Sequence, residues 1–367
     1  MPELVVLAEQ LYAPVPGGTG RYTAELLAAL TADPAPGWTV RAVTAWHAGR
    51  GPSAGLPAVR RLPLPRRGLT AVWERGVPLW PGGDSVHAPT PLAPPRPRRG
   101  RRLVVTVHDT VPFTHPETLT PRGAAWHRAA IARATRHADA VVVPTAAVAA
   151  DLRRFAPGPA PVHVVGHGVP AALLREPDPA AADAVARRLG LPAGYVLAVG
   201  TVEPRKGLAV LIDALARPGG PDLPLVLAGP AGWGGVDPAR LAVDRGLSAG
   251  RLRVLGRVTD ADLAVVLRRA SVLAVPSLAE GFGLPVLEAM AVGVPVVHSD
   301  APALVEVGGD ATVVTPRGDP EALATALRDT VNGRSAALVH RARRRAADFT
   351  WEKAAREVWE VHAGLYR

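Results

Sequence analysis

Residues 271–298 read SVLAVPSLAEGFGLPVLEAMAVGVPVVH, and the order of residue types in this stretch decides the fold. A short apolar run at 271–276 is followed by a glycine-containing turn, an apolar helical pattern and a second apolar run at 294–298. Leu284, followed by proline, can begin the helix, because proline is favoured in the first helical turn, and Gly293 can end it. The stretch is therefore a strand–helix–strand unit, from which parallel sheets are built.

The same alternation continues over the whole chain. Short apolar runs recur ahead of helical patterns at 4–7, 102–107, 140–144, 195–200 and 223–229. These runs do not alternate with polar residues, which is typical of strands buried on both faces. We therefore predict an α/β protein with two Rossmann-like doubly wound domains, separated within the irregular, proline-containing segment 166–190.

The composition limits what the protein can be. Its 367 residues suffice for about two domains. It has no cysteine, which excludes disulfides, cysteine-ligated zinc sites and cysteine nucleophiles. The amino-terminal MPELVVLAEQ lacks the basic segment of a signal peptide, and no run approaches the ~18 apolar residues of a membrane span. We therefore expect a cytoplasmic protein.

The net charge of +10 comes almost entirely from arginine, since Lys206 and Lys353 are the only lysines. GC-rich codon usage explains such a bias without any function. Attraction to an anion explains it equally well, and the anion would be a phosphorylated substrate, an acidic membrane face or a nucleic acid.

The loops that follow the apolar runs are the places to search for chemistry, because open parallel sheets bind ligands beyond the carboxyl ends of their strands. Gly17, Gly18 and Gly20 sit just before a predicted helix, where backbone N–H groups can approach a phosphate. His108 and Asp109 form a polar pair at the end of a predicted central strand. A flexible turn and a structural histidine are the alternatives.

The loop after 195–200 carries Arg205 and Lys206 ahead of a predicted helix. Arginine can bind phosphate oxygens as a fork, and lysine acts as a point charge. The alternative is a solvated basic loop, but at the end of a strand these residues predict an anion-binding site.

The turn within the opening stretch supplies groups that bind oxygen. The N–H groups of residues 281–284 suit a phosphate or a sugar oxygen. Glu280, just before the helix, can accept hydrogen bonds from hydroxyls, and Glu288, about two turns into the helix, can reach a diol such as a ribose. We therefore predict a pocket for a sugar attached to a nucleotide.

Several of these motifs together resemble retaining GT-B glycosyltransferases of family 4, also called group 1. GTVEPRKG at 200–207 and EGFGLPVLEAMAVGVPVV at 280–297 resemble the donor-site signature of that family, including two glutamates separated by seven residues. GGTGRYTAELL at 17–27 and HDTVPFTHPE at 108–117 resemble it near the amino terminus. The likeness covers nearly the whole chain. Within the family, these motifs most resemble the mannosyltransferase-like branch.

The resemblance implies a GT-B fold, in which two Rossmann-like doubly wound domains face each other across a cleft. It implies an acceptor-binding domain over 1–168, a donor-binding domain over 169–348, and a carboxyl-terminal helix over 349–367 that crosses back to the first domain. At the hinge, Gly166-His167-Gly168 departs from the family, which often has asparagine before the glycine. The role of His167 stays open at this point.

The resemblance also implies roles for individual residues. Arg205 and Lys206 correspond to a diphosphate clamp, Glu280 to a ligand of the sugar hydroxyls, and Glu288 to a ligand of the ribose. His108 corresponds to a residue beneath the reacting sugar. The expected catalytic residues are His108, Arg205, Lys206 and Glu280. The expected donor-binding residues are Gly18, Arg205, Lys206, Val258, Glu280, Gly281, Phe282, Gly283, Leu284 and Glu288. The candidates on the acceptor side are Asp109 and Arg21.

The expected reaction moves a sugar, with GDP-mannose favoured and UDP- or dTDP-sugars as alternatives, from a nucleoside diphosphate to an acceptor hydroxyl. The family is read as a same-face mechanism with retained configuration, in which a phosphate oxygen takes the acceptor's proton. Neither a metal nor a cofactor is expected, because cationic side chains and helix dipoles neutralise the diphosphate. The acceptor is a sugar, a lipid-linked molecule or another small molecule, and an anionic membrane is a further expected contact of the arginines in 96–102.

Three alternatives belong to other classes. A GT-B phosphorylase needs a lysine for pyridoxal phosphate, which fits poorly with two lysines, and an epimerase of the same fold is a further variant. A nucleic-acid binder is favoured by PPRPRRGRR and RARRRAADF, but few aromatic residues interleave with the arginines to stack on bases, so no nucleic-acid partner is expected. The third alternative is a sugar-nucleotide sensor without catalytic activity, and the intact set of His108, Arg205, Lys206, Glu280 and Glu288 argues against it.

Overall fold

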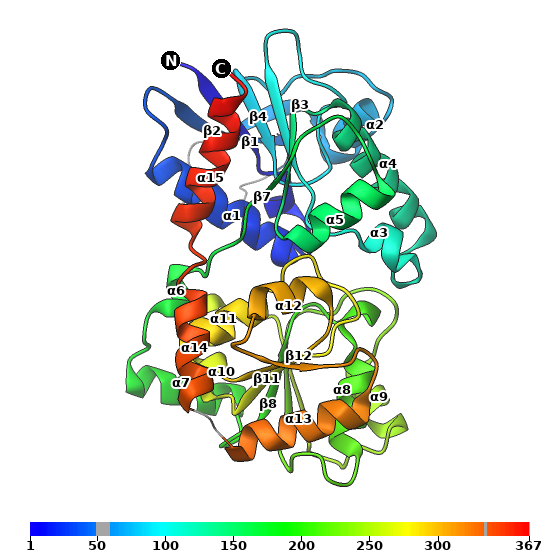
Figure 1. Cartoon of the computed structure of the whole chain (residues 1–367), viewed down its shortest axis with the longest axis vertical. Coiled ribbons are helices and arrows are strands. Elements are labelled where there is room, and N and C mark those ends of the chain that lie inside the picture. Colours follow the sequence, from blue (N-terminus) through cyan, green and yellow to red (C-terminus); the bar gives the residue numbers. More distant parts are fainter. Residues whose placement is uncertain (49–58, 334–335, 367) are drawn as a thin grey trace. The chain divides into compact units, whose positions relative to one another are not determined.

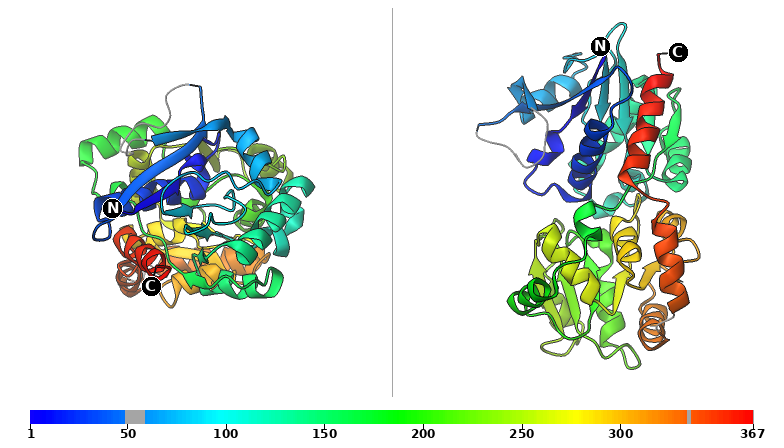
Figure 2. Two further views of the ribbon diagram at one scale, coloured as in Figure 1. Left: turned by 90° about the horizontal axis from the view of Figure 1, so that it is seen from above. Right: turned by 90° about the vertical axis from the view of Figure 1, so that its left-hand side faces the viewer.

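The computed structural model describes residues 1–48, 59–333 and 336–366, so the last residue of the expected carboxyl-terminal segment lies outside it. The chain divides into two α/β units (Figure 1). Unit 1 contains Met1–Gly168 and Thr350–Arg367, and unit 2 contains Val169–Phe349. Both termini therefore belong to unit 1 (Figure 2).

Unit 1 is built on a parallel sheet that has seven strands within the described residues, in the order β3-β2-β1-β4-β5-β6-β7. The apolar runs form its centre, where all four residues of β6 are buried. The strands are β1 (Glu3–Leu7), β2 (Thr39–Trp46), β3 (Val59–Pro65), β4 (Ser85–Ala88), β5 (Arg102–Thr106), β6 (Ala140–Val143) and β7 (Val162–Val164).

Helices surround this sheet, and several begin at a threonine whose side chain accepts a hydrogen bond from a backbone N–H of the first turn, as Thr120, Thr145 and Thr350 do. The α-helices are α1 (Gly17–Ala32), α2 (Arg66–Glu74), α3 (Val111–Thr114), α4 (Pro121–His137), α5 (Ala146–Phe155) and α15 (Trp351–Gly364). The 3₁₀ turns are η1 (Glu9–Tyr12) and η2 (Pro116–Thr118).

The last helix, α15, completes the core of unit 1. Its side chains Trp351, Val358 and Trp359 are buried in one apolar cluster with Leu26 of α1 and Val104 of β5. These aromatic and aliphatic residues recur at helical spacing, so one stripe of the helix covers a face of the sheet. Figure 1 shows α15 alongside α1.

Unit 2 repeats the design with a six-stranded parallel sheet, counted over its described residues, in the order β10-β9-β8-β11-β12-β13. Along β11, Val272 and Ala274 enter one apolar cluster while Leu273 and Val275 enter the other, so both faces are covered. The strands are β8 (Val196–Val199), β9 (Leu225–Ala228), β10 (Leu252–Gly256), β11 (Val272–Val275), β12 (Val296–Ser299) and β13 (Val313–Thr315).

The helices of unit 2 connect these strands. They are α6 (Ala171–Leu174), α7 (Pro179–Leu189), α8 (Leu208–Ala216), α9 (Pro238–Asp244), α10 (Asp260–Arg269), α11 (Leu284–Val292), α12 (Pro302–Gly308), α13 (Pro320–Gly333) and α14 (Ala336–Ala346), together with the 3₁₀ turn η3 (Pro204–Lys206).

Both sheets reverse their strand order at one point, between β1 and β4 in unit 1 and between β8 and β11 in unit 2. This is the 3-2-1-4-5-6 order of a Rossmann fold, in which ligands bind beyond the carboxyl ends of the strands beside the reversal. The prediction of two doubly wound parallel sheets is confirmed. The loops after β1, β4, β8 and β11 are therefore where this topology favours ligand binding.

Two local predictions are wrong. Gly17, Gly18 and Gly20 lie inside the first turns of α1, not ahead of it, because the helix already begins at Gly17. Glu288 lies one turn into α11 rather than two, because that helix begins at Leu284.

Candidate active site

The loops after β8 and β11 bring three predicted residues of unit 2 into direct contact. The carboxylate of Glu280 accepts hydrogen bonds from Lys206 Nζ at 2.7 Å and from a terminal nitrogen of Arg205 at 2.8 Å. It also accepts a bond from Ser277 Oγ at 2.7 Å. Because β8 and β11 are neighbours at the strand-order reversal, their loops meet at one place.

Arg205 makes further hydrogen bonds that fix its guanidinium group. It donates to the Ala279 carbonyl at 2.6 Å and to Glu203 Oε1 at 2.6 Å. Only 14% of the Arg205 side chain and 9% of the Glu280 side chain are exposed. We call Glu203, Arg205, Lys206, Ser277 and Glu280 the unit 2 cluster, and its bonds fix the cationic groups before any ligand arrives.

The pKa values of the two glutamates in the cluster are shifted in opposite directions. Burial alone would raise the pKa of Glu280, but Arg205, Lys206 and the hydrogen bonds from Lys206 and Ser277 lower it to about 2. Burial raises the pKa of Glu203 despite the same two cations, and the charge of Glu280 adds to the rise. Glu280 is thus firmly anionic, whereas Glu203 holds a proton more readily than an ordinary glutamate.

The amino end of α11 continues this region. Gly283 has a φ of 100°, a left-handed conformation, and an added Cβ there would lie 2.5 Å from Leu304 Cδ2, so glycine is required. Glu288 is 2% exposed in the following turn. Phe282 packs its ring on Phe349 at 5.8 Å, so its side chain serves the core.

The remaining predicted donor residues follow the same sheet edge. Gly281 precedes α11, and half-buried Val258 lies in the loop after β10. No group of three or more His, Asp or Glu side chains within the described residues is arranged to hold a metal ion.

In unit 1, His108 follows β5 and is fixed by the loop after β4. Its Nε2 lies 2.7 Å from the Pro89 carbonyl, and because a carbonyl only accepts, Nε2 is the donor. Burial lowers the pKa of His108, although the Pro89 bond and Asp109 oppose the shift. The ring is therefore neutral near pH 7 and presents Nδ1 as its acceptor.

The hinge residue His167, unassigned from the sequence, belongs to an aromatic cluster in unit 1. Its ring stacks on Trp351 with centroids 5.8 Å apart and lies 4.7 Å from Tyr22. Tyr22 in turn contacts His108 edge-on at 4.6 Å. The adjacent Gly168 is required, since an added Cβ would come within 2.6 Å of the Thr350 carbonyl carbon.

A buried chain of neutral polar groups lies behind Tyr22. Its phenol oxygen is 3.1 Å from Thr106 Oγ1, which is 3.0 Å from His87 Nε2. His87 Nδ1 then meets His362 Nε2 at 3.2 Å, and His362 Nδ1 meets Ser85 Oγ at 2.7 Å. We call these five residues the unit 1 network, and it links α15 to the tyrosine that contacts His108.

The candidates on the acceptor side fall in different positions. Asp109 accepts a bond from the Val111 N–H at 3.1 Å, which fixes the turn that leads into α3. Arg21 and Gly18 both lie near the start of α1. Asp109 therefore follows β5 and its carboxylate already has a structural role, whereas Arg21 belongs to a different element, α1.

A second group at the carboxyl edge of unit 1 was not predicted. Glu9, after β1, is 6% exposed and accepts bonds through Oε2 from the Ala45 N–H at 2.9 Å and from His47 Nε2 at 3.1 Å. Tyr12 stacks on His47 at 4.3 Å. Within the described residues Glu9 Oε1 has no hydrogen-bond partner, and Arg66 Nε is 3.9 Å from it.

Sequence reasoning missed Glu203, Ser277 and Glu9 for the same reason. Each lies within four residues of the end of a strand, which is the signal that could have identified them. Glu203 lies within GTVEPRKG and Ser277 within 271–298, and both were still passed over, because a single acidic or hydroxyl side chain does not show which groups it contacts in the fold.

Comparison with known proteins gives two family matches. The model described as glycosyl transferases group 1 matches residues 160–349, which is about half of the chain, and the model described as glycosyltransferase family 4 matches residues 16–173. No helix in the described part of the chain is long and apolar enough to cross a membrane.

Curated relatives match over part of their length. O-antigen chain mannosyltransferase B of Escherichia coli is 40% identical over 164 residues, which cover 43% of each chain. D-inositol 3-phosphate glycosyltransferase of Salinispora arenicola is 38% identical over 247 residues, covering 61% of this chain and 54% of the relative. The chain thus spans about half the length of the curated relatives it matches.

Solved structures match over the whole chain. Sucrose-phosphate synthase of Thermosynechococcus elongatus superimposes with a TM-score of 0.77 at 22% identity, covering 100% of this chain and 99% of that one. HepE of Anabaena, solved with UDP and glucose, superimposes with a TM-score of 0.75 at 20% identity, covering 99% of this chain and 100% of HepE. At these identities the likeness shows the fold, which is GT-B. Together with the matched family models, it establishes that the chain belongs to the glycosyl transferases of group 1.

Proposed function

We propose that this protein transfers a sugar from a nucleoside-diphosphate sugar to an acceptor hydroxyl, with retained configuration and by a same-face route. The observation that carries the proposal is the unit 2 cluster, in which two cations, two glutamates and a serine lie beside the strand-order reversal and the amino end of α11. Such a site is suited to a ligand with a charged diphosphate next to hydroxyl groups.

Three residues of the cluster, and Glu288 beyond it, have separate tasks in this proposal. Lys206 gives one N–H to Glu280, so two of its three donors remain for diphosphate oxygens. Arg205 stabilises the same oxygens as charge grows on the leaving group. Glu280, which stays anionic, accepts hydrogen bonds from the sugar hydroxyls, and Glu288 binds the ribose.

The same-face route needs no protein carboxylate as nucleophile. The glycosidic carbon–oxygen bond to the diphosphate breaks, positive charge develops on the sugar, and the acceptor oxygen attacks from the same side while a phosphate oxygen takes its proton. We assign His108 to orient the sugar. A neutral imidazole suits this task, because it does not repel the developing positive charge.

The acceptor is bound by unit 1 in this proposal. Glu9 Oε1 is buried without a hydrogen-bond partner in the described structure, and a hydroxyl group of a sugar or polyol would supply the missing donor. Tyr12 and His47 form a stacked pair beside it that can pack against a sugar ring. The acceptor is therefore a hydroxyl-rich molecule, either free or linked to a lipid.

A lipid-linked acceptor would bring unit 1 to an anionic membrane. Arg96, Arg98 and Arg99 are exposed in the loop before β5, whereas Arg101 pairs with Asp84. Each exposed arginine can contribute about 1 kcal/mol at an acidic surface. Changing these three to serine should reduce sedimentation with acidic-lipid vesicles, and equal binding of variant and wild type would remove this part of the proposal.

The donor is proposed to be GDP-mannose. The motifs at 17–27, 108–117 and 200–207 support this choice, as does a relative named as a mannosyltransferase. UDP- and dTDP-sugars are the alternative. Thermal unfolding and donor hydrolysis, measured over a panel of GDP-, UDP- and dTDP-sugars, test both the proposed transferase activity and the proposed preference for GDP. A response to UDP-sugars alone rejects the GDP preference, and no response to any sugar nucleotide rejects the transferase.

A further inference from the structure

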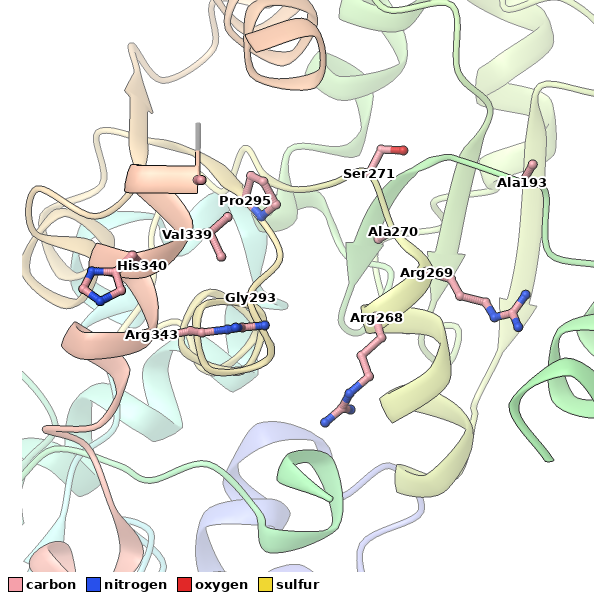
Figure 3. A pocket seen from close by; sticks show the side chains of 11 residues that line it. Ala193, Arg268, Arg269, Ala270, Ser271, Gly293, Pro295, Val339, His340 and Arg343 are labelled. Atoms are coloured by element: carbon pink, nitrogen blue, oxygen red, sulfur yellow. The ribbon is translucent and has the colours of Figure 1, made fainter. Parts of the chain in front are cut away.

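A cavity of about 580 Å³ lies in unit 2 at the edge of the sheet opposite the unit 2 cluster. Its walls include Ala193, Ser271 and Pro295, which lie just before the first residues of β8, β11 and β12, respectively. The end of α10 and one side of α14 complete it. Parallel strands carry the residues of the cluster at their other ends, so the cavity is a separate place in the molecule. Figure 3 shows the side chains that line the cavity.

The charges on the cavity wall come from arginine. Arg268 at the end of α10 and Arg343 on α14 both line it, and Figure 3 shows Arg343 reaching across the end of α11 to Gly293. The neighbouring Arg269 also lines the cavity, but its guanidinium is already paired with Asp183. Two guanidinium groups therefore remain on the cavity wall without an ion-pair partner within 4 Å among the described residues.

The backbone contacts of these two arginines do not use up their donors. Arg343 donates to the Val292 carbonyl at 3.3 Å, and Arg268 donates to the carbonyls of Leu173, Leu174 and Ala264 at 2.8–3.2 Å. A guanidinium has five N–H groups, so about four remain on Arg343 and about two on Arg268. Capping the ends of helices thus accounts for part of this arrangement only.

The two guanidinium groups are close enough to oppose each other. Burial lowers the pKa of Arg268, and the charge of Arg343 lowers it further, while Glu176 acts in the opposite direction. Gly293 is required beside them, because an added Cβ would collide with the guanidinium of Arg343, and its φ of 84° is left-handed. An anion placed between two like charges relieves their repulsion and accepts from both forks.

We propose that this cavity binds the phosphate group of a small soluble molecule between Arg268 and Arg343. A phosphate has several strong acceptor oxygens and can receive bonds from two guanidinium groups at once. The volume exceeds what a phosphate ion fills and lies in the range of small-molecule sites, so the ligand carries an additional organic part. This proposal does not depend on the identity of the donor sugar.

Calorimetric titration with inorganic phosphate at constant ionic strength tests the site. Arg343→Gln should weaken this binding about tenfold, the effect of losing one charge-assisted contact. Arg344→Gln is the matched control, since it removes the same charge from the next residue of α14, which does not line the cavity. Circular dichroism should show that both variants fold, because residues 343 and 344 are exposed.

A third variant separates this cavity from the donor region. Lys206→Gln should leave phosphate binding at the cavity in place. The proposal is overturned if Arg343→Gln binds phosphate like wild type, if Arg343→Gln and Arg344→Gln lose affinity equally, or if Lys206→Gln abolishes all binding. Vesicles containing phosphatidic acid should sediment wild type and Arg343→Gln equally, and a loss confined to that variant would assign the site to a lipid and overturn the soluble ligand.

Discussion

Unit 1 and unit 2 share one sheet design but bury different kinds of polar group beside it. In unit 2, Glu280 is held between Arg205 and Lys206, and its pKa falls to about 2. In unit 1, His87 and His362 form one hydrogen-bonded chain with hydroxyl groups, and burial lowers the pKa of His87 to about 3. The first group is charged at neutral pH and the second is not.

This difference indicates two physical tasks. A buried charged cluster is costly unless its partners are fixed, and it is useful where a charged ligand must be bound. A buried neutral network fixes geometry without attracting ions. We infer that the unit 2 cluster acts on the donor, whereas the unit 1 network positions Tyr22 and, through it, His108.

The largest expected effect is loss of unit 1 upon deletion of residues 350–367. Burial of Trp351, Val358 and Trp359 contributes about 5–9 kcal/mol at 1.5–3 kcal/mol for each large side chain. That is comparable to the net stability of a typical domain, about 5–15 kcal/mol. Seven of the eight tryptophans are in unit 1, so tryptophan fluorescence should report an unfolded environment. A truncated protein with native fluorescence and activity would contradict the role of α15.

Acid should unfold unit 1 before unit 2. Burial lowers the pKa of His87, His167 and His362 below the ordinary value near 6.5, so the unfolded chain binds more protons than the folded one below that pH. Stability therefore falls as the pH drops from about 6.5 towards 3, by about 1.4 kcal/mol per group and pH unit. In unit 2, burial likewise lowers the pKa of His298, and the depressed pKa of Glu280 adds a cost only from about pH 4.5 down to 2, so unit 2 has fewer groups of this kind than unit 1 among the described residues.

The comparison is measured in one acid titration. Tryptophan fluorescence follows mainly unit 1, whereas far-ultraviolet circular dichroism follows both units. We expect the fluorescence midpoint at a higher pH than the completion of the dichroism change. Coincident transitions with a midpoint below pH 4 would show that the histidines do not control the acid stability of unit 1.

A smaller effect is expected from His362→Phe, which keeps an aromatic ring but removes both ring nitrogens. Ser85 and His87 then lose a buried hydrogen-bond partner, at about 1–3 kcal/mol for an unsatisfied group. Glu360→Gln is the control, because Glu360 is exposed on the same helix. Urea unfolding should show a lower midpoint for the histidine variant only. Equal midpoints would mean that the network contributes no stability.

The sequence predicted the fold where strands are purely apolar and failed where they are not. The runs that became β1, β5, β6, β8, β9, β11 and β12 were all identified. β4 was missed because its polar residues Ser85 and His87 are more typical of a loop than of a buried strand. They are buried here because each forms a hydrogen bond with His362, which is far away in the sequence. β3 was missed because it is an edge strand carrying exposed Arg60 and Arg61.

The candidate residues were predictable as single positions but their pairings were not. A motif identified Arg205, Lys206 and Glu280, yet nothing in the sequence shows that the one carboxylate pairs with both cations. That contact depends on β8 and β11 being adjacent in the sheet. Glu203, although it lies within GTVEPRKG, and Glu9 were not singled out, because their importance comes from burial, which a local sequence pattern does not report.

Glu280→Gln and Glu288→Gln, compared by turnover and by titration with the nucleoside diphosphate of the donor, test the central claim most directly. Glu280→Gln should lower turnover about 100-fold or more, or about 2.7 kcal/mol, because its contacts strengthen as the sugar approaches the transition state. Its affinity for the free nucleotide should not fall, since Arg205 and Lys206 lose a competing carboxylate. Glu288→Gln should instead weaken nucleotide binding and raise KM. Unchanged turnover in the first variant together with equal nucleotide affinity in both would contradict the assignment of the unit 2 cluster to the donor.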